Sequence, residues 1–168
     1  EEHTSERVYC LRATGAGKTP CAPSLGLLEL REAVCKHSWL TYRVRLSPDR
    51  IVVTSGTSPA MLLIFASLLE TDDEVILSDP HYACYPNFIS FCNGRPVNVP
   101  VVEEEGFQYV PEAIREKLTS RTRAILINSP SNPTGTLLGA DRMAEIAAFG
   151  IPVISDEIYH GLVYKGKA

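Results

Sequence analysis

The 168-residue sequence has no long apolar run and no strong excess of one charge. No stretch approaches the roughly 20 apolar residues that a membrane-spanning helix needs. The net charge is −4, without a basic patch or an acidic tail, so nucleic acids and membrane surfaces are poor candidate partners. The amino end lacks the basic and then apolar pattern of a signal peptide. We therefore expect a soluble, cytoplasmic protein that acts on small molecules.

Metal-binding and disulfide patterns are also lacking. The five cysteines are odd in number, and none forms a C-x-x-C pair or has metal-ligand spacing with the four histidines. The cysteines are Cys10, Cys21, Cys35, Cys84 and Cys92. We expect reduced thiols that act as small apolar side chains, with neither a metal site nor a disulfide.

Short apolar runs alternate with helical segments along the sequence. Strands are predicted over 50–54, 74–79, 95–101, 124–128 and 151–159. Helices are predicted over 27–39, 61–70, 87–92, 111–118 and 138–149. Prolines in the third predicted strand place it at a sheet edge. The alternation predicts an α/β protein with a mostly parallel sheet and flanking helices.

A glycine turn joins the first predicted strand to an apolar helix. The turn carries Gly56, Thr57 and Ser58. Backbone N–H groups at a helix start are unpaired and favour an anion, and hydroxyl groups add further donors. The turn thus has the outline of an anion site, although a plain helix cap would use the same residue types.

Polar and aromatic residues follow the later strands, where open α/β sheets bind ligands. Tyr82 could stack on a flat ligand or cover the edge of the core. Asn132 lies in a loop stiffened by prolines, which fits a directed amide or an ordinary connection. Asp156 and Tyr159 come three residues apart at the end of the last predicted strand.

Together these segments resemble the fold-type I, class I aminotransferases of the aspartate aminotransferase type, which use pyridoxal 5′-phosphate (PLP). The resemblance runs from about Thr19 to Tyr164. The matching stretches are Pro23-Ser-Leu-Gly26-x-x-Glu29-Leu30-Arg31, Thr54-Ser-Gly56-Thr-Ser-x-Ala60, Asp79-Pro80-x-Tyr82-x-x-Tyr85-Pro86, Asn128-Ser-Pro-x-Asn132-Pro-Thr-Gly135 and Ser155-Asp156-Glu157-Ile158-Tyr159.

The resemblance implies a role for each candidate residue. Gly56, Thr57 and Ser58 would hold the cofactor phosphate, Tyr82 would stack on the pyridine ring, Asn132 and Tyr159 would hydrogen-bond its phenolic oxygen, and Asp156 would pair with the ring nitrogen. A carboxylate beside that nitrogen favours its protonated, electron-withdrawing form. The implied reaction moves an amino group between an amino acid and a 2-oxo acid, in a homodimer.

The resemblance also implies that parts of the family's structure are missing from this sequence. The family's catalytic lysine lies on a strand well beyond the Asp-x-x-Tyr motif, whereas Lys165 and Lys167 lie too near Asp156. The family's small domain is missing as well. We therefore expect residues 1–22 to be a poorly defined segment and 23–168 to be an incomplete PLP-binding large domain. Such a chain alone is expected to be inactive and loosely folded or prone to aggregation.

The same residues are compatible with other functions. A C–S lyase or cyclopropane-forming synthase could use the same fold and cofactor, and a non-catalytic protein could retain the fold as a sensor or scaffold. A dinucleotide-binding oxidoreductase domain is a further alternative, because Asp79 ends the second strand about 20 residues after the glycine turn. That turn lacks the G-x-G-x-x-G pattern, however.

Overall fold

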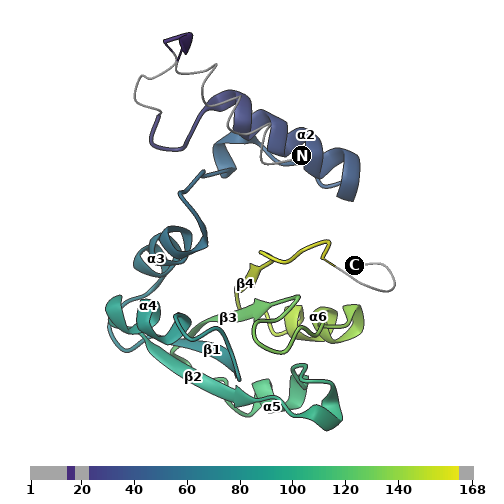
Figure 1. Cartoon of the computed structure of the whole chain (residues 1–168). Helices are drawn as coiled ribbons and strands as arrows, with labels where there is room; N and C mark the ends of the chain where they lie inside the picture. Colours follow the sequence, from purple (N-terminus) through teal and green to yellow (C-terminus); the bar gives the residue numbers. More distant parts are fainter. Residues whose placement is uncertain (1–14, 18–22, 163–168) are drawn as a thin grey trace. The chain divides into compact units, whose positions relative to one another are not determined.

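The computed structural model describes residues 15–17 and 23–162. The chain forms two compact units, residues 1–55 and 56–168 (Figure 1). Cys10, Cys21, Lys165 and Lys167 lie outside the described residues. Within the described ranges, no helix is long and apolar enough to cross a lipid bilayer.

The first unit contains helix α2 (Leu28–Tyr42) and the short 3₁₀ helix η1 (Pro48–Arg50). The buried side chain of Arg31 holds them together, because its guanidinium donates to the carbonyl oxygens of Gly26 (3.3 Å) and Pro48 (2.9 Å). The predicted helix is confirmed, but its apolar side chains, including Leu30 and Val34, are exposed.

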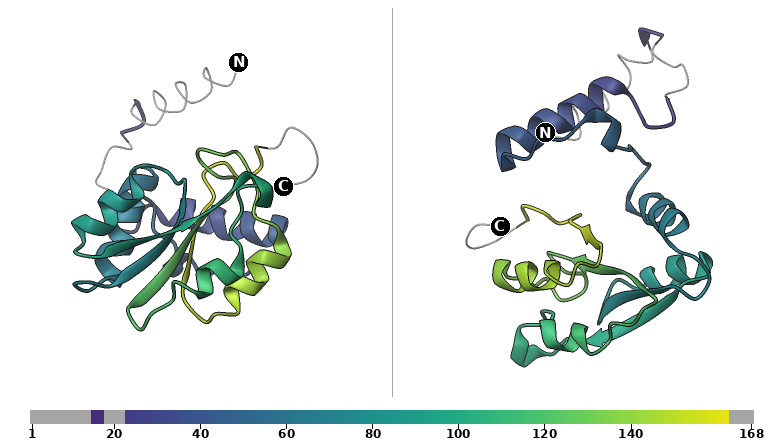
Figure 2. Two further views of the ribbon diagram at one scale, coloured as in Figure 1. Left: turned by 90° about the horizontal axis from the view of Figure 1, so that it is seen from below. Right: turned by 180° about the vertical axis from the view of Figure 1, so that it is seen from behind.

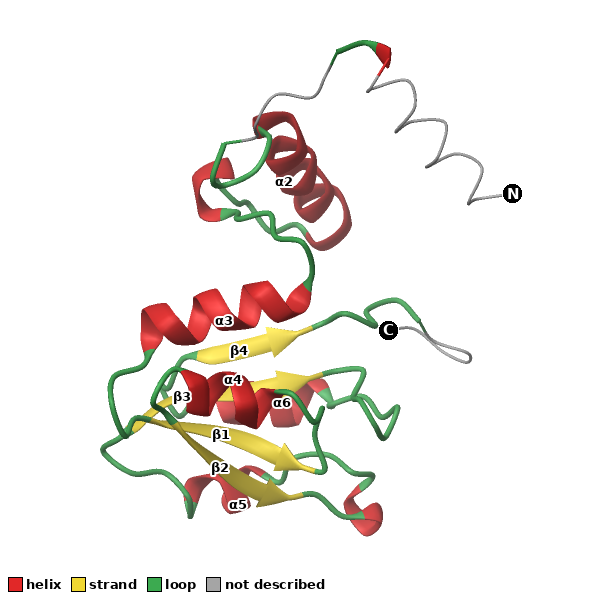
Figure 3. Cartoon of the chain, turned by 60° about the vertical axis from the view of Figure 1, so that its left-hand side comes forward, coloured by secondary structure: helices red, strands yellow, loops and turns green. Residues whose placement is uncertain are grey.

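The second unit is an α/β structure built on a parallel sheet. Its strands are β1 (Glu74–Asp79), β2 (Arg95–Pro100), β3 (Thr122–Asn128) and β4 (Val153–Asp156). Its helices are α3 (Thr57–Leu68), α4 (Tyr85–Phe91), α5 (Pro111–Arg115), α6 (Ala140–Ala147) and the 3₁₀ helix η2 (Glu103–Glu105). The strand order is β2-β1-β3-β4, and every neighbouring pair is parallel (Figure 3). The predicted fold class is confirmed, and β2 lies at a sheet edge as its prolines indicated.

Alternating residues of the central strands point into two separate cores. Val75 and Leu77 of β1 pack with Phe65 of α3 and Ile89 of α4 on one face of the sheet. On the other face, Ile76 packs with side chains from α5 and α6. The further views separate the two groups of helices, with the strands between them (Figure 2). Burial on both faces explains why β1 and β3 are continuous apolar runs.

The strand predicted over 50–54 is wrong, because residues 51–54 adopt no strand in the structure. A strand requires a hydrogen-bonded neighbour, and this segment has no strand partner among the described residues. Its backbone contacts include a bond from the Val53 N–H to the Leu25 carbonyl oxygen (3.0 Å). Four strands therefore form the described sheet, rather than five.

The last predicted strand is shorter and less buried than expected. β4 covers only four residues, and Val153 and Ser155 are exposed while Asp156 is buried. Within the described residues β4 pairs with β3 alone, so it is an edge strand.

The predicted helices are confirmed, with shifted ends. The apolar sequence of α3 favours burial, but the helix buries Met61 and Phe65 while Leu63 is 56% exposed. α4 begins at Tyr85, two residues before the predicted start, because Pro86 fits the first turn of a helix. α5 and α6 are both shorter than their predicted ranges.

Candidate functional site

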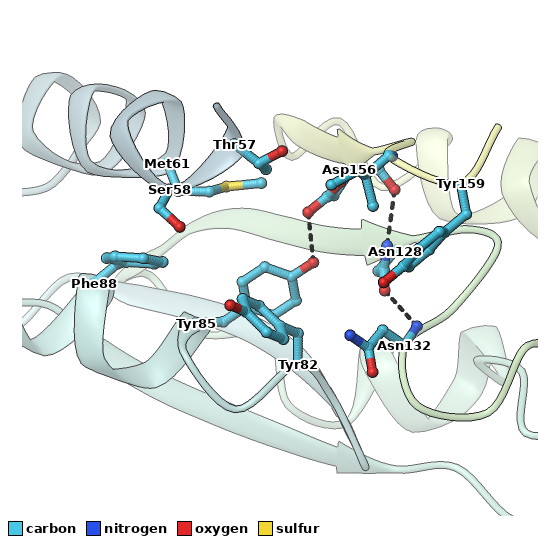
Figure 4. A pocket seen from close by; sticks show the side chains of 11 residues that line it. Thr57, Ser58, Met61, Tyr82, Tyr85, Phe88, Asn128, Asn132, Asp156 and Tyr159 are labelled. Carbon is cyan, nitrogen blue, oxygen red and sulfur yellow. Dashed lines mark hydrogen bonds between the residues drawn. The ribbon is translucent and has the colours of Figure 1, made fainter. Parts of the chain in front are cut away.

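A hollow of about 210 Å³ lies at the carboxyl ends of β3 and β4, between the start of α3 and the loop that leads into α4. Figure 4 shows the side chains around it. Its lining residues are Thr57, Ser58, Met61, Tyr82, Tyr85, Phe88, Asn128, Asn132, Asp156, Ile158 and Tyr159. The hollow therefore lies where parallel sheets place ligands.

Six of the seven residues that the sequence singled out line this hollow. The seventh, Gly56, is the N-cap of α3 and directly precedes Thr57. Gly56 has φ 132° and ψ 178°, in a region that favours glycine. No side chain of the described residues caps this helix. The first N–H groups of α3 and the hydroxyls of Thr57 and Ser58 are thus the donors at this end of the hollow.

Asp156 supplies the only carboxylate among the lining residues. It ends β4 and is 6% exposed. Its Oδ2 accepts a hydrogen bond from the Tyr85 hydroxyl (2.7 Å), and its Oδ1 accepts one from the Ile158 N–H (3.2 Å). A buried carboxylate needs such partners, since its charged form is otherwise costly to bury.

Asn128 connects the loop after β3 to the end of β4. Its Nδ2 donates to the Asp156 carbonyl oxygen (3.0 Å), and its Oδ1 accepts the N–H of Asn132 (2.6 Å). Asn128 and Asp156 are direct neighbours in the strand register. The dashed lines in Figure 4 show both bonds of the Asn128 amide. The backbone of Asn132 is therefore positioned relative to the carboxylate by one side-chain amide.

Two tyrosines form the aromatic side of the hollow. The rings of Tyr82 and Tyr85 meet edge to face, with centroids 5.4 Å apart and planes at 80°. Interaction with the Cys84 side chain raises the pKa of Tyr82 above its usual value. Burial and the hydrogen bond to Asp156 raise the pKa of Tyr85 far above its usual range. Both phenols therefore keep their protons at neutral pH.

The sequence pointed to the loops of this site but missed two of its polar residues, besides the apolar Met61, Phe88 and Ile158. Asn128 and Tyr85 stood inside the motifs without an assigned role. The signal for Asn128 was its position at the very end of a buried strand, beside the polar loop. The spacing of Tyr82 and Tyr85 could not tell which ring reaches the Asp156 carboxylate.

The arrangement suits a flat ligand that carries an anionic group. Hydrogen-bond donors stand at the start of α3, a buried carboxylate and an amide lie across from them, and an aromatic ring borders the space between. Among the described residues, no group of three His, Cys, Asp or Glu side chains could hold a metal ion. The acid is placed to pair with a basic or protonated ring atom of such a flat ligand.

Comparisons with known proteins agree on one family. Residues 12–168 match the family model described as aminotransferase class I and II. A probable aspartate/prephenate aminotransferase of Aquifex aeolicus is 45% identical over 159 residues, which cover 92% of this chain and 40% of the relative. The chain thus spans well under half the length of this relative.

Solved structures give the same result. An alanine aminotransferase of Pyrococcus furiosus is 38% identical, with a TM-score of 0.92, over 99% of this chain and 43% of that protein. An aromatic aminotransferase of Pyrococcus horikoshii is 34% identical, with a TM-score of 0.93, over 99% and 46% respectively.

Proposed function

This chain belongs to the class I and II aminotransferase family, and we propose that the complete protein transfers an amino group between an amino acid and a 2-oxo acid with PLP as cofactor. The observation that carries the proposal is the Asp156 carboxylate, buried and held by two donors, in a hollow whose other end is the start of α3. Those two features match the two ends of the cofactor.

The residues would divide the binding of the cofactor among them. Thr57, Ser58 and the N–H groups that follow Gly56 would bind the phosphate. Tyr82 would stack on the ring, and Asn132 and Tyr159 would donate to its phenolic oxygen. Asp156 would hold a proton on the ring nitrogen.

When bound, the protonated ring withdraws electrons from the carbanion that an amino acid forms on losing its α-proton. Asp156 would serve that chemistry by keeping a negative charge beside the nitrogen. Donors to the phenolic oxygen would offset its negative charge and fix the ring in its plane.

The domain assignment and the assembly are part of the same proposal. Residues 23–168 would be part of the large PLP-binding domain, and the complete protein would act as a cytoplasmic homodimer. The relatives carry aspartate, alanine and aromatic names, so the amino acid substrate is left open. A lyase or a non-catalytic protein would share the same cofactor site, and no feature of the site favours either.

The test is an Asp156→Asn variant of the complete protein. We expect PLP, followed by absorbance and fluorescence titration, to bind at least about tenfold more weakly, because a charge-assisted pair is lost. Amino transfer from aspartate or alanine to 2-oxoglutarate should fall by several orders of magnitude. The wild-type protein should not bind NAD.

The matched control is Asp79→Asn. Asp79 also ends a strand at this side of the sheet but is exposed and does not line the hollow. It should bind PLP as the wild type does. Equal affinity of Asp156→Asn and the wild type for PLP would contradict the proposed site.

A further inference from the structure

Tyr85 makes a buried hydrogen bond that the cofactor assignment does not use. It begins α4, is 1% exposed, and donates to Oδ2 of Asp156, a residue 71 positions away in the sequence. Figure 4 shows its hydroxyl directed at the carboxylate. The bond therefore links the helix that follows β1 to the end of β4.

Another buried tyrosine, Tyr109, shows what a tyrosine of the core does in this fold. Tyr109 is also buried, at 4% exposure, and its hydroxyl donates to the backbone carbonyl oxygen of Leu126 (2.9 Å). A backbone carbonyl is the usual partner of a buried polar side chain. Tyr85 instead donates to the one acidic side chain of the hollow.

The two donors to Asp156 fix the plane of its carboxylate. Tyr85 occupies one acceptor position of Oδ2, and the Ile158 N–H occupies one of Oδ1. Each oxygen of an ionised carboxylate has a second acceptor position. A ligand in the hollow would meet these remaining positions in a set direction, without the cost of ordering a free side chain at binding.

The phenol is a dependable donor in this place. Burial and the neighbouring carboxylate raise the pKa of Tyr85 far above that of a free tyrosine. Its proton therefore stays on the oxygen at neutral pH. The bond thus persists whenever Asp156 is ionised.

We propose that Tyr85 is a positioning residue, which holds the Asp156 carboxylate in the orientation that meets the ring nitrogen of the cofactor. The inference rests on the proposed function, since it assumes that Asp156 pairs with that nitrogen. It adds a residue that acts through Asp156 rather than on the reacting atoms.

The test compares two ligands in three forms of the complete protein. The ligands are PLP and its 1-deaza analogue, in which a C–H group replaces the ring nitrogen. The forms are wild type, Tyr85→Phe and, as the matched control, Tyr109→Phe. Each affinity is measured by fluorescence titration, and the ratio of the two affinities is the readout.

Wild type should prefer PLP over the analogue, and Tyr85→Phe should lose about tenfold of that preference while its affinity for the analogue stays unchanged. Tyr109→Phe should keep the wild-type preference. The absorption band of bound PLP should also shift in Tyr85→Phe alone, because the protonation of its ring changes.

The possible outcomes separate the two proposals. A wild-type protein that binds both ligands equally would disprove the pairing of Asp156 with the ring nitrogen, and with it the proposed cofactor site. A wild-type preference that survives in Tyr85→Phe would overturn the positioning role alone. A Tyr85→Phe protein that binds neither ligand would show that the bond supports the fold, which also overturns the positioning role.

Discussion

The amide of Asn128 satisfies two backbone groups that belong to different segments. It donates to the Asp156 carbonyl oxygen and accepts the Asn132 N–H. An amide offers both a donor and an acceptor on the end of one short side chain. The residue therefore fixes the distance between the end of β4 and the polar loop, even if it never touches a ligand.

Replacing Asn128 by aspartate should break one of these bonds and keep the other. The new carboxylate still accepts the Asn132 N–H, but it meets the Asp156 carbonyl oxygen without a proton to donate. We expect a loss of about 2 kcal/mol in the free energy of unfolding. Urea denaturation followed by circular dichroism measures it.

The control for this change is Asn98→Asp, at an exposed position of β2. Its stability should stay within about 0.5 kcal/mol of wild type. Similar losses in both variants would argue against the bridging role of Asn128.

At the scale of single residues, the sequence predicted which loops carry the site better than it predicted which side chains hydrogen-bond to each other. Asp156 and Asn132 could be singled out because strands end beside them. The hydroxyl of Tyr85 reaches Asp156 across 71 residues of sequence, and no local pattern encodes that approach. Only the packing of α4 against the sheet brings the two side chains together.

At the scale of elements, Asp73 connects three segments at the amino ends of the strands. It is buried just before β1, and its Oδ2 accepts the Glu70 N–H after α3 (2.9 Å) and the Nε of Arg123 on β3 (3.0 Å). Its carbonyl oxygen accepts the N–H of Arg95, where β2 begins (2.7 Å). The hydrogen bond from Glu70, and then the contact with Arg123, lower the pKa of Asp73 below its usual 3.8.

A lowered pKa in the folded state makes the contribution of Asp73 depend on pH. The ionised form is the one that the fold stabilises, so the contribution is complete well above pH 3.8 and is lost as the pH falls through that value towards the lower folded-state pKa. Asp73→Asn should therefore be less stable than wild type at pH 7, and the difference should shrink below pH 4. Urea midpoints measured from pH 7 to pH 3 test this.

Asp72→Asn is the matched control for Asp73. The Asp72 side chain is 41% exposed in its ion pairs with Arg95 and Arg121, and exposed pairs contribute little. A difference between wild type and Asp73→Asn that stays constant across this pH range would contradict the pH dependence.

Whether a segment forms a strand or a helix was easier to predict than which strand it pairs with. β1 and β3 are apolar on both faces, and that pattern survives any arrangement of the sheet. Residues 51–54 carry the same β-branched signal, yet they form no strand because strand formation depends on a neighbour that sequence propensity does not reveal.

At the scale of the whole molecule, much apolar surface stays exposed. α2 leaves Leu28, Leu30 and Leu40 exposed, and in the second unit Leu63 and Phe91 are exposed as well. Large exposed apolar areas mark surfaces that bind another partner or that aggregate. The 168-residue chain thus carries surface that is normally covered in a folded protein.

We expect the 168-residue chain, expressed alone, to show no amino transfer and to bind a fluorescent dye that reports exposed apolar surface. The complete protein should transfer amino groups and bind little dye. Measurable turnover by the purified 168-residue chain would contradict this expectation.

The two edges of the sheet differ in their chemistry. The N–H groups of Arg95 and Val101 donate towards β1, to the carbonyl oxygens of Asp73 and Asp79. Because successive N–H groups of a strand point to opposite sides, the nitrogens of Pro96 and Pro100 face the outer edge of β2, where a proline has no proton to donate.

The opposite edge of the described sheet, formed by β4, has no proline that removes an outward backbone donor. The carbonyl oxygens of Pro152 and Asp156 accept the N–H groups of Ile125 and Ser129 on the β3 side. Because successive backbone groups point to opposite sides, the N–H groups of Val153 and Ser155 face the outer edge of β4. A strand beside β4 would thus find backbone donors that the two prolines remove from the outer edge of β2. The prolines protect the β2 edge from pairing with another strand, whereas the β4 edge lacks this protection.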